Sequence, residues 1–170
     1  MKKETSLLLN QEQVDKEYVI AELHKQKSGT EWATKTNDWA IAQIEKVAEG
    51  VWVKGLLPEE YFLKIILRKH RHTTDKTSQD IFLLENEDIS ISEARDIFEQ
   101  ASRYHHPECI EHVEYLKGEI REKGFTSSVV LNEEGGELKH LDGLHRLLAL
   151  SLLLKEGYNY QPVPVLINIK

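Results

Sequence analysis

Cysteine is almost absent from this sequence: Cys109 is the only one among 170 residues. A single cysteine cannot form an internal disulfide bond or a thiolate metal cluster. Long apolar runs are missing from the N-terminal segment, which has two lysines and only three consecutive leucines. That is too short for the apolar region of a signal peptide or for a membrane span. We therefore expect a cytoplasmic protein that does not enter a membrane.

Positive charge is also scarce. Lysine and arginine number 22 against 29 aspartates and glutamates, which gives a net charge of −7 at pH 7. Non-specific binding of nucleic acid depends on cations that neutralise phosphates, so this balance argues against DNA as a partner. Apolar residues make up 40% of the chain and charged residues 30%. This composition suits one domain with a buried core, with or without a small appended subdomain.

The first 80 residues are expected to form a mostly helical extension. Asn10 is placed to cap a helix over residues 11–27, and apolar periodicity predicts a second helix over 37–48. Shorter features follow: a strand at 51–53, a turn at 55–58, an apolar run at 61–67 that periodicity leaves undecided between helix and strand, and a polar loop at 68–80.

The remaining chain, residues 81–170, is expected to form the core. Ser90 and Glu93 have capping-box spacing, which predicts a helix from Ile91 to about residue 104. Pro107 suits the first turn of another helix, which should end at Gly124. The other predicted elements are strands at 81–84, 127–131, 138–141 and 163–167, a hairpin turn at 132–136 and a helix at 144–155. This order of strands and helices predicts an α/β fold of the α+β kind.

The stretch HLDGLHRLLAL, residues 140–150, is the best candidate for a functional site. Gly143 would let the backbone approach a ligand, and the start of the following helix would favour an anion. Arg146 offers a planar fork suited to phosphate oxygens. His145 can donate to phosphate or shuttle a proton. Asp142, whose carboxylate would repel phosphate, could serve as a metal ligand, a hydroxyl acceptor or a brace for Arg146.

An ordinary helix start would explain the same residues. In this alternative Asp142 caps the helix, His145 lies on the surface and Arg146 lays its stem along apolar surface. The helix that follows is apolar nearly all round, so its body should be buried in either case.

Three phrases in this order, GFTSSVVLN, HLDGLHRLLAL and YQPVPVLIN, resemble the ParB/sulfiredoxin-like superfamily over residues 107–167. The resemblance implies a loop that binds nucleotide phosphates through the residues Gly143, Leu144, His145 and Arg146. Sulfiredoxins carry a cysteine where this chain has Leu144, which argues against their reaction. ParB proteins continue into a DNA-binding helix-turn-helix after this fold, and we expect none here because the sequence ends at Lys170.

Within that superfamily the chain looks most like the free-serine kinases. The resemblance implies nucleotide-dependent phosphoryl transfer to a small hydroxyl-bearing metabolite, such as a free amino acid. It places Glu108 as the general base, with Asp142 and His145 as further catalytic residues. His112, four residues after Glu108, would share its helix face and could contact Glu108 or the substrate.

The position of the general base has alternatives. Glu108 could instead simply favour a helix N-terminus. The sequence also has an extra helix before Glu108, where the family would have a short connection. This departure leaves three other candidates for the base: Glu85, Glu87 and Asp88.

The resemblance further implies ATP or ADP as cofactor, with Mg²⁺ held mostly by phosphates. Thr126 and Ser127 could donate to phosphate or ribose, or could simply begin a strand. The five histidines between residues 105 and 145 lack a recognised zinc spacing. Two other functions stay open: a non-catalytic nucleotide-binding adaptor, whose N-terminal helices would contact a protein partner or a second copy, and a ParB-like ATPase or nuclease.

Overall fold

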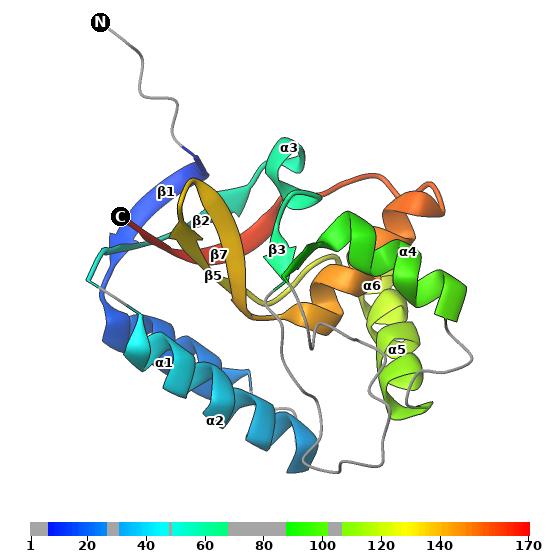
Figure 1. Ribbon diagram of the computed structural model, residues 1–170, viewed down its shortest axis with the longest axis horizontal. Coiled ribbons are helices and arrows are strands. Elements are labelled where there is room, and N and C mark those ends of the chain that lie inside the picture. The colour runs from blue at the N-terminus through cyan, green and yellow to red at the C-terminus, as the bar shows by residue number, and fades with distance from the viewer. Residues whose placement is uncertain (1–6, 27–30, 48, 68–87, 102–106) are drawn as a thin grey trace, which may run out of the picture. The chain divides into compact units, whose positions relative to one another are not determined.

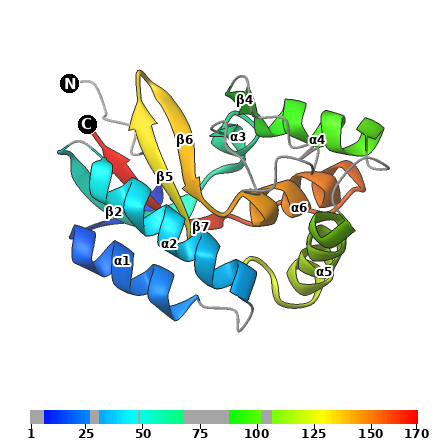
Figure 2. The same ribbon diagram turned by 60° about the horizontal axis from the view of Figure 1, so that its bottom comes forward.

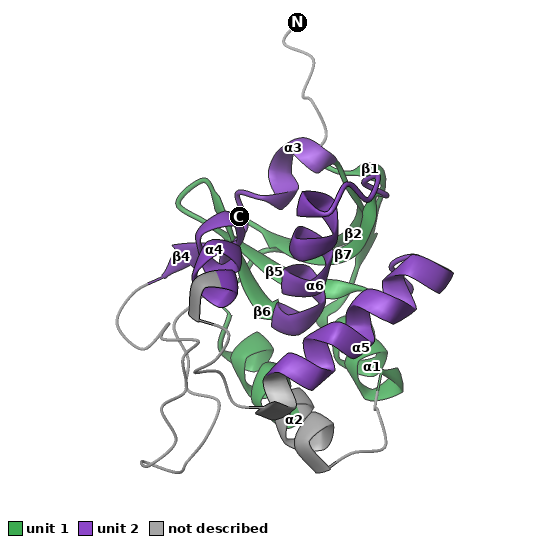
Figure 3. Ribbon diagram, turned by 90° about the vertical axis from the view of Figure 1, so that its right-hand side faces the viewer, with its two compact units in different colours: residues 1–58, 127–142, 162–170 green, residues 59–126, 143–161 purple. Residues whose placement is uncertain are grey.

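The computed structural model shows a mixed α/β protein (Figure 1). The chain forms two compact units, each assembled from separate segments of the sequence (Figure 3). Unit 1 takes residues 1–58, 127–142 and 162–170, and unit 2 takes residues 59–126 and 143–161. The structure describes residues 7–26, 31–47, 49–67, 88–101 and 107–170.

Unit 1 contains five strands in the order β1-β2-β7-β5-β6. Their bounds are Leu9–Val14 for β1, Val51–Leu57 for β2, Val129–Glu134 for β5, Glu137–Asp142 for β6 and Val163–Ile169 for β7. Neighbours run antiparallel except β5 and β7, which are parallel. The sheet thus pairs strands from both ends of the sequence.

Two helices belong to unit 1: α1, Lys16–Lys25, and α2, Glu31–Lys46. They lie side by side (Figure 2). Buried residues from both helices and from four strands share one core, which contains Val19, Leu23, Ala40, Ile44, Trp52, Val130, Leu141 and Leu166. Burial of apolar surface against the sheet therefore stabilises the two helices.

The hairpin between β5 and β6 confirms the predicted turn, but the turn itself is shorter and consists of two glycines. Gly135 and Gly136 have φ angles of 64° and 82°. Positive φ at both central residues is the requirement of a two-residue type I′ turn, which glycine meets without steric cost. Pairing continues as far as Glu134 and Glu137, so the strands use residues that the sequence assigned to the turn.

Unit 2 is mainly helical, and its central helix is α6, Leu144–Lys155. In Figures 1 and 2, α6 lies between α4, Ile91–Ala101, and α5, Pro107–Lys123. The unit also holds α3, Glu59–Phe62, and the paired strands β3, Ile66–Leu67, and β4, Ile89–Ser90. Nine of the twelve residues of α6 are buried, which confirms the prediction of a buried helix.

The boundaries of α4 and α5 follow local signals. The Ser90 N–H donates to Glu93 at 2.8 Å and the Glu93 N–H donates to the Ser90 hydroxyl at 3.2 Å, which completes the predicted capping box. Helix α5 begins at Pro107 as predicted. It ends before Gly124, whose φ is 73° and whose N–H donates to the Ile120 carbonyl at 2.9 Å.

The helix expected over residues 11–27 is wrong in its first part. Residues 9–14 form strand β1, and α1 starts only at Lys16. Asp15 caps it in place of Asn10, because the Asp15 carboxylate accepts the Tyr18 N–H at 2.7 Å. Asn10 has a φ of 54° and lies at an irregularity in the pairing of β1 with β2. Backbone pairing to β2, which local periodicity does not report, decides this segment.

The turn expected at residues 55–58 is also wrong, because β2 continues through Gly55 to Leu57. A Cβ at Gly55 would lie 2.8 Å from the Leu9 carbonyl oxygen, so glycine here permits close approach of β1. Other boundaries shift as well: α2 begins at residue 31 instead of 37, and β5 begins at residue 129 instead of 127. The undecided run at 61–67 divides between the end of α3 and β3.

Some predictions lie outside the described residues: the loop at 68–80, the strand at 81–84 and the domain boundary at residue 80. Among the helices that the structure describes, none combines the length and apolarity needed to cross a membrane.

Candidate functional site

The site predicted from the sequence centres on the start of α6. Gly143 is the N-cap residue of this helix and has a φ of 100°, a left-handed conformation that favours glycine. Its carbonyl accepts the Leu147 N–H at 2.9 Å, which closes the first helical turn. Helices α1 and α4 receive a side-chain cap from Asp15 and Ser90, whereas Gly143 has no side chain to offer. The N-cap residue therefore leaves the first N–H groups of α6 to other partners.

An ordinary capped helix start does not describe this segment. Asp142 is not the cap: it is the last residue of β6, is 8% exposed and pairs with Val130. His145, expected on the surface in that alternative, is only 7% exposed. The expectations for Asp142 and His145 are therefore wrong, because the polar start of this helix is buried. The expectation that the Arg146 stem lies along apolar surface stays a prediction.

Packing of α5 on α6 brings two predicted site residues together. The ring centroids of His112 and His145 are 5.4 Å apart, with an edge-on angle of 70°. Arg146, half-buried, follows His145 on α6. We call these three residues the His112–His145–Arg146 cluster. It combines two imidazoles and a guanidinium at the positive end of a helix, a composition that suits an anion.

The cluster also sets the charge of His112. Burial lowers the pKa of His112 and the nearby Arg146 guanidinium lowers it further. Since the ordinary pKa of histidine is already below 7, His112 is neutral at neutral pH. A neutral imidazole can both donate and accept a hydrogen bond.

Tyr115 is a neighbour that the sequence analysis missed. Its ring stacks on His112 with centroids 6.5 Å apart and an interplanar angle of 17°, and it is 62% exposed. The spacing of three residues on one helix was the available signal.

The candidates for the general base are placed less completely. Glu108 lies in the first turn of α5, one turn before His112. The Glu108 side chain is not among those that the structure describes. Asp88 is exposed just before β4, and Glu85 and Glu87 fall outside the described residues. The assignment of the base to Glu108 stays a prediction.

Thr126 and Ser127 lie in the connection between α5 and β5. Thr126 is exposed and Ser127 is half-buried, and neither is part of the strand. Their roles as nucleotide contacts stay predictions. Across the described ranges, no group of three or more histidine, cysteine, aspartate or glutamate residues could hold a metal ion.

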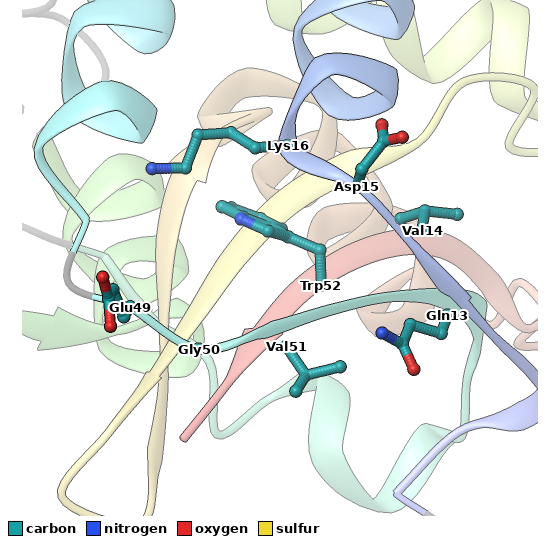
Figure 4. Close-up of a pocket in the computed structure, with 8 residues that line it drawn as sticks. All are labelled: Gln13, Val14, Asp15, Lys16, Glu49, Gly50, Val51 and Trp52. Atoms are coloured by element: carbon teal, nitrogen blue, oxygen red, sulfur yellow. The ribbon is translucent and has the colours of Figure 1, made fainter.

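A separate hollow of about 440 Å³ opens in unit 1. Figure 4 shows the Trp52 side chain on one side of strand β2 and the Val51 side chain on the other, as alternation along a strand requires. Lys16, at the start of α1, lies on the same side as Trp52. The remaining lining residues are Gln13, Val14, Asp15, Glu49 and Gly50. None of the predicted site residues lines it, and nothing in the sequence analysis pointed to it.

No protein-family model, curated protein or solved structure matches this chain. Any assignment of function therefore depends on the chemistry of the site itself.

Proposed function

We propose that this chain is a nucleotide-dependent phosphotransferase built on a ParB/sulfiredoxin-like core. It would transfer a phosphoryl group from ATP or ADP to the hydroxyl of a small metabolite, such as a free amino acid. The observation that carries the proposal is the start of α6, where a left-handed Gly143 and the His112–His145–Arg146 cluster come together.

The phosphate end of the site has two sources of positive potential. The Arg146 guanidinium can bind two phosphate oxygens in parallel. The first turn of α6 presents N–H groups at the positive end of the helix dipole. Leu144 is 6% exposed and the helix behind it is buried, so this anion site would be held rigidly. Rigid donors stabilise the transferring phosphoryl group without reorganisation.

At the acceptor end, Glu108 is the proposed general base. Its carboxylate takes the proton of the substrate hydroxyl while that oxygen bonds to the terminal phosphorus, and the bond to the departing nucleotide breaks. His112, one turn along the same helix, orients the substrate or Glu108. His145 contacts the phosphate, and Asp142 serves as a hydroxyl acceptor or a metal ligand.

A magnesium ion would come with the nucleotide. Within the part of the chain that the structure describes, no cluster of ligating side chains is ready for a metal. Mg²⁺ is usually bound by substrate phosphates and one or two carboxylates. When bound, it would neutralise charge on the phosphates.

Titration calorimetry with ATP, ADP and CTP in the presence of Mg²⁺ tests the phosphate end. We expect saturable binding to at least one nucleotide, and about tenfold weaker binding or more by Arg146→Ala, because the lost hydrogen bonds are charge-assisted. Arg121→Ala is the matched control: it removes the same charge from an exposed arginine that pairs with Glu156. The absence of binding to all three nucleotides would refute the proposal.

A second candidate is a non-catalytic nucleotide-binding adaptor. Two exposed aromatic side chains on the N-terminal helices support it: Tyr18 on α1, 36% exposed, and Trp39 on α2, 39% exposed. Aromatic residues are enriched at protein interfaces. Nucleotide binding without transfer to any hydroxyl compound, and without hydrolysis, would favour this candidate. Hydrolysis without an acceptor would favour a ParB-like ATPase.

A further inference from the structure

The His112–His145–Arg146 cluster places side chains that can carry positive charge on two packed helices. His112 comes from α5, and His145 and Arg146 come from the first turn of α6. The two imidazole rings are in edge-on contact, 5.4 Å between centroids. The positive end of the α6 dipole points to the same place. The Arg146 guanidinium and the helix dipole both oppose a positive charge at His112.

Among the described residues, the groups known to lie around His112 come from two helices, α5 and α6. From its own helix, Tyr115 stacks on the ring, while Glu111 and Glu114 are exposed. From α6, the helix packed against α5, His145 and Arg146 face it. Glu108 precedes it by one turn, with a side chain outside the description. The combined effect is the lowered pKa of His112, caused by burial and by Arg146.

A bound dianion would reverse this balance. An anionic group within about 4–6 Å typically stabilises the charged form of a histidine by one pKa unit or more. His112 would then take up a proton when the ligand binds. By linkage, a group that gains a proton on binding makes the affinity rise as the pH falls.

We infer that phosphate binding at the start of α6 is coupled to the uptake of one proton by His112. This inference rests on the proposed function, since it concerns the same phosphate site. His112 is the proton acceptor because it is half-buried and reachable from solvent, whereas His145 is almost completely buried. A charge on a buried imidazole costs more free energy of desolvation.

The coupling also defines a class of ligand. A terminal phosphate or a free phosphomonoester carries close to two negative charges, enough to offset both Arg146 and a protonated His112. A phosphodiester carries one negative charge, which Arg146 alone neutralises. The site therefore selects terminal phosphates over the diester backbone of nucleic acids.

Sulfate is a suitable probe, because it stays a dianion throughout the range in which histidine titrates. The protonation of His112 would be followed by NMR of its labelled imidazole, with and without sulfate. We expect sulfate to raise the pKa of His112. Its affinity should rise on going from about pH 8 to about pH 6, at most about tenfold per pH unit, the limit for one proton. His112→Gln should remove this dependence, while His24→Gln, at an exposed site on α1, should keep it.

Calorimetry with ATP in buffers of different ionisation enthalpy would count the protons directly. Uptake by the wild type that is lost in His112→Gln supports the inference. Nucleotide binding without proton uptake would overturn the inference and leave the proposed function standing. Uptake that persists in His112→Gln but disappears in Glu108→Gln would assign the proton to Glu108 and also overturn it. If neither sulfate nor nucleotide binds, the proposed function fails together with the inference.

Discussion

Two residues of α5 have different roles in the proposed reaction: one is the general base, and the other orients the substrate. Glu108 and His112 are four residues apart, the spacing that brings side chains together on a helix. Burial and Arg146 lower the pKa of His112 in the free protein, and under the proposed function Glu108 is the base while His112 orients the substrate. Their roles can be separated, because a base affects turnover more than it affects nucleotide binding.

Glu108→Gln tests that division at the level of one residue. The substitution keeps the shape and removes the proton acceptor, so we expect transfer to the acceptor to fall about 10²- to 10⁴-fold. The affinity for nucleotide should stay within about threefold of the wild type, because the carboxylate does not bind phosphate. Single-turnover transfer from labelled nucleotide measures the first quantity and calorimetry measures the second.

Glu111→Gln is the matched control, because Glu111 is an exposed glutamate on the same helix. If both variants transfer at the wild-type rate, Glu108 is not the base. Asp88 would then be the next described candidate to substitute.

Among the elements, the helices α1, α4 and α6 begin at N-cap residues of two different kinds. Side chains of Asp15 and Ser90 cap α1 and α4. Helix α6 instead begins at a glycine in the left-handed conformation. The side chain of an N-cap residue stabilises the helix that it caps, whereas a glycine at this position has no side chain that could accept from the first N–H groups. The helix at which we propose phosphate binding, α6, is therefore the one whose N-cap residue has no side chain.

The Ser90 capping box gives a prediction at this scale. Ser90→Ala should lower the free energy of unfolding by about 1 kcal/mol at neutral pH. The two hydrogen bonds from Ser90 lower the pKa of Glu93. A carboxylate with a lowered folded pKa stabilises the protein above its unfolded pKa and loses this effect as the pH falls through the folded value. The cost of Ser90→Ala should therefore shrink at about pH 3.

Urea unfolding at both pH values measures this effect. Ser92→Ala is a suitable control on the same helix, where the Ser92 hydroxyl accepts a long bond of 3.4 Å from Arg95. An equal loss of stability in both variants would show that the box contributes nothing specific.

At the scale of the whole molecule, the main feature is that unit 1 is assembled from three separate segments of the chain. Residues up to 58 share this unit with residues 127–142 and 162–170. Strand β2 pairs with β7 along its whole length, and Val19, Leu23, Ile44 and Trp52 contribute to one core with Leu141 and Leu166. The N-terminal third therefore supplies both backbone pairing and core side chains to this unit.

A fragment of residues 81–170, the core that the sequence delimits, tests this integration. We expect it to lack a cooperative thermal transition, because β7 loses a neighbour and the core loses several large side chains, each contributing about 1.5–3 kcal/mol. Circular dichroism and NMR dispersion would show the loss. Removal of residues 1–6 alone is the control, since it leaves every described element in place. A well-folded fragment would show instead that residues 81–170 fold without the stabilisation that the N-terminal third provides.

Local sequence signals determined several elements of this protein. The capping box at Ser90, the proline at 107, the glycine at 124 and the leucine-rich run of α6 each act within a few residues of themselves. Their effects are hydrogen bonds, fixed backbone angles and a periodicity, all of which can be read without knowledge of the fold.

Only the tertiary structure decided the remaining features. Apolar and polar residues do not alternate over residues 9–14, so the sequence does not predict a strand there. Pairing with β2 makes this segment a strand. Gly55 suggests a turn until the close approach of Leu9 gives it a place within a strand. The meeting of His112 with His145 requires α5 to pack on α6. Strand pairing and helix packing join residues that are distant in the chain, so local patterns do not report the free energy that stabilises them.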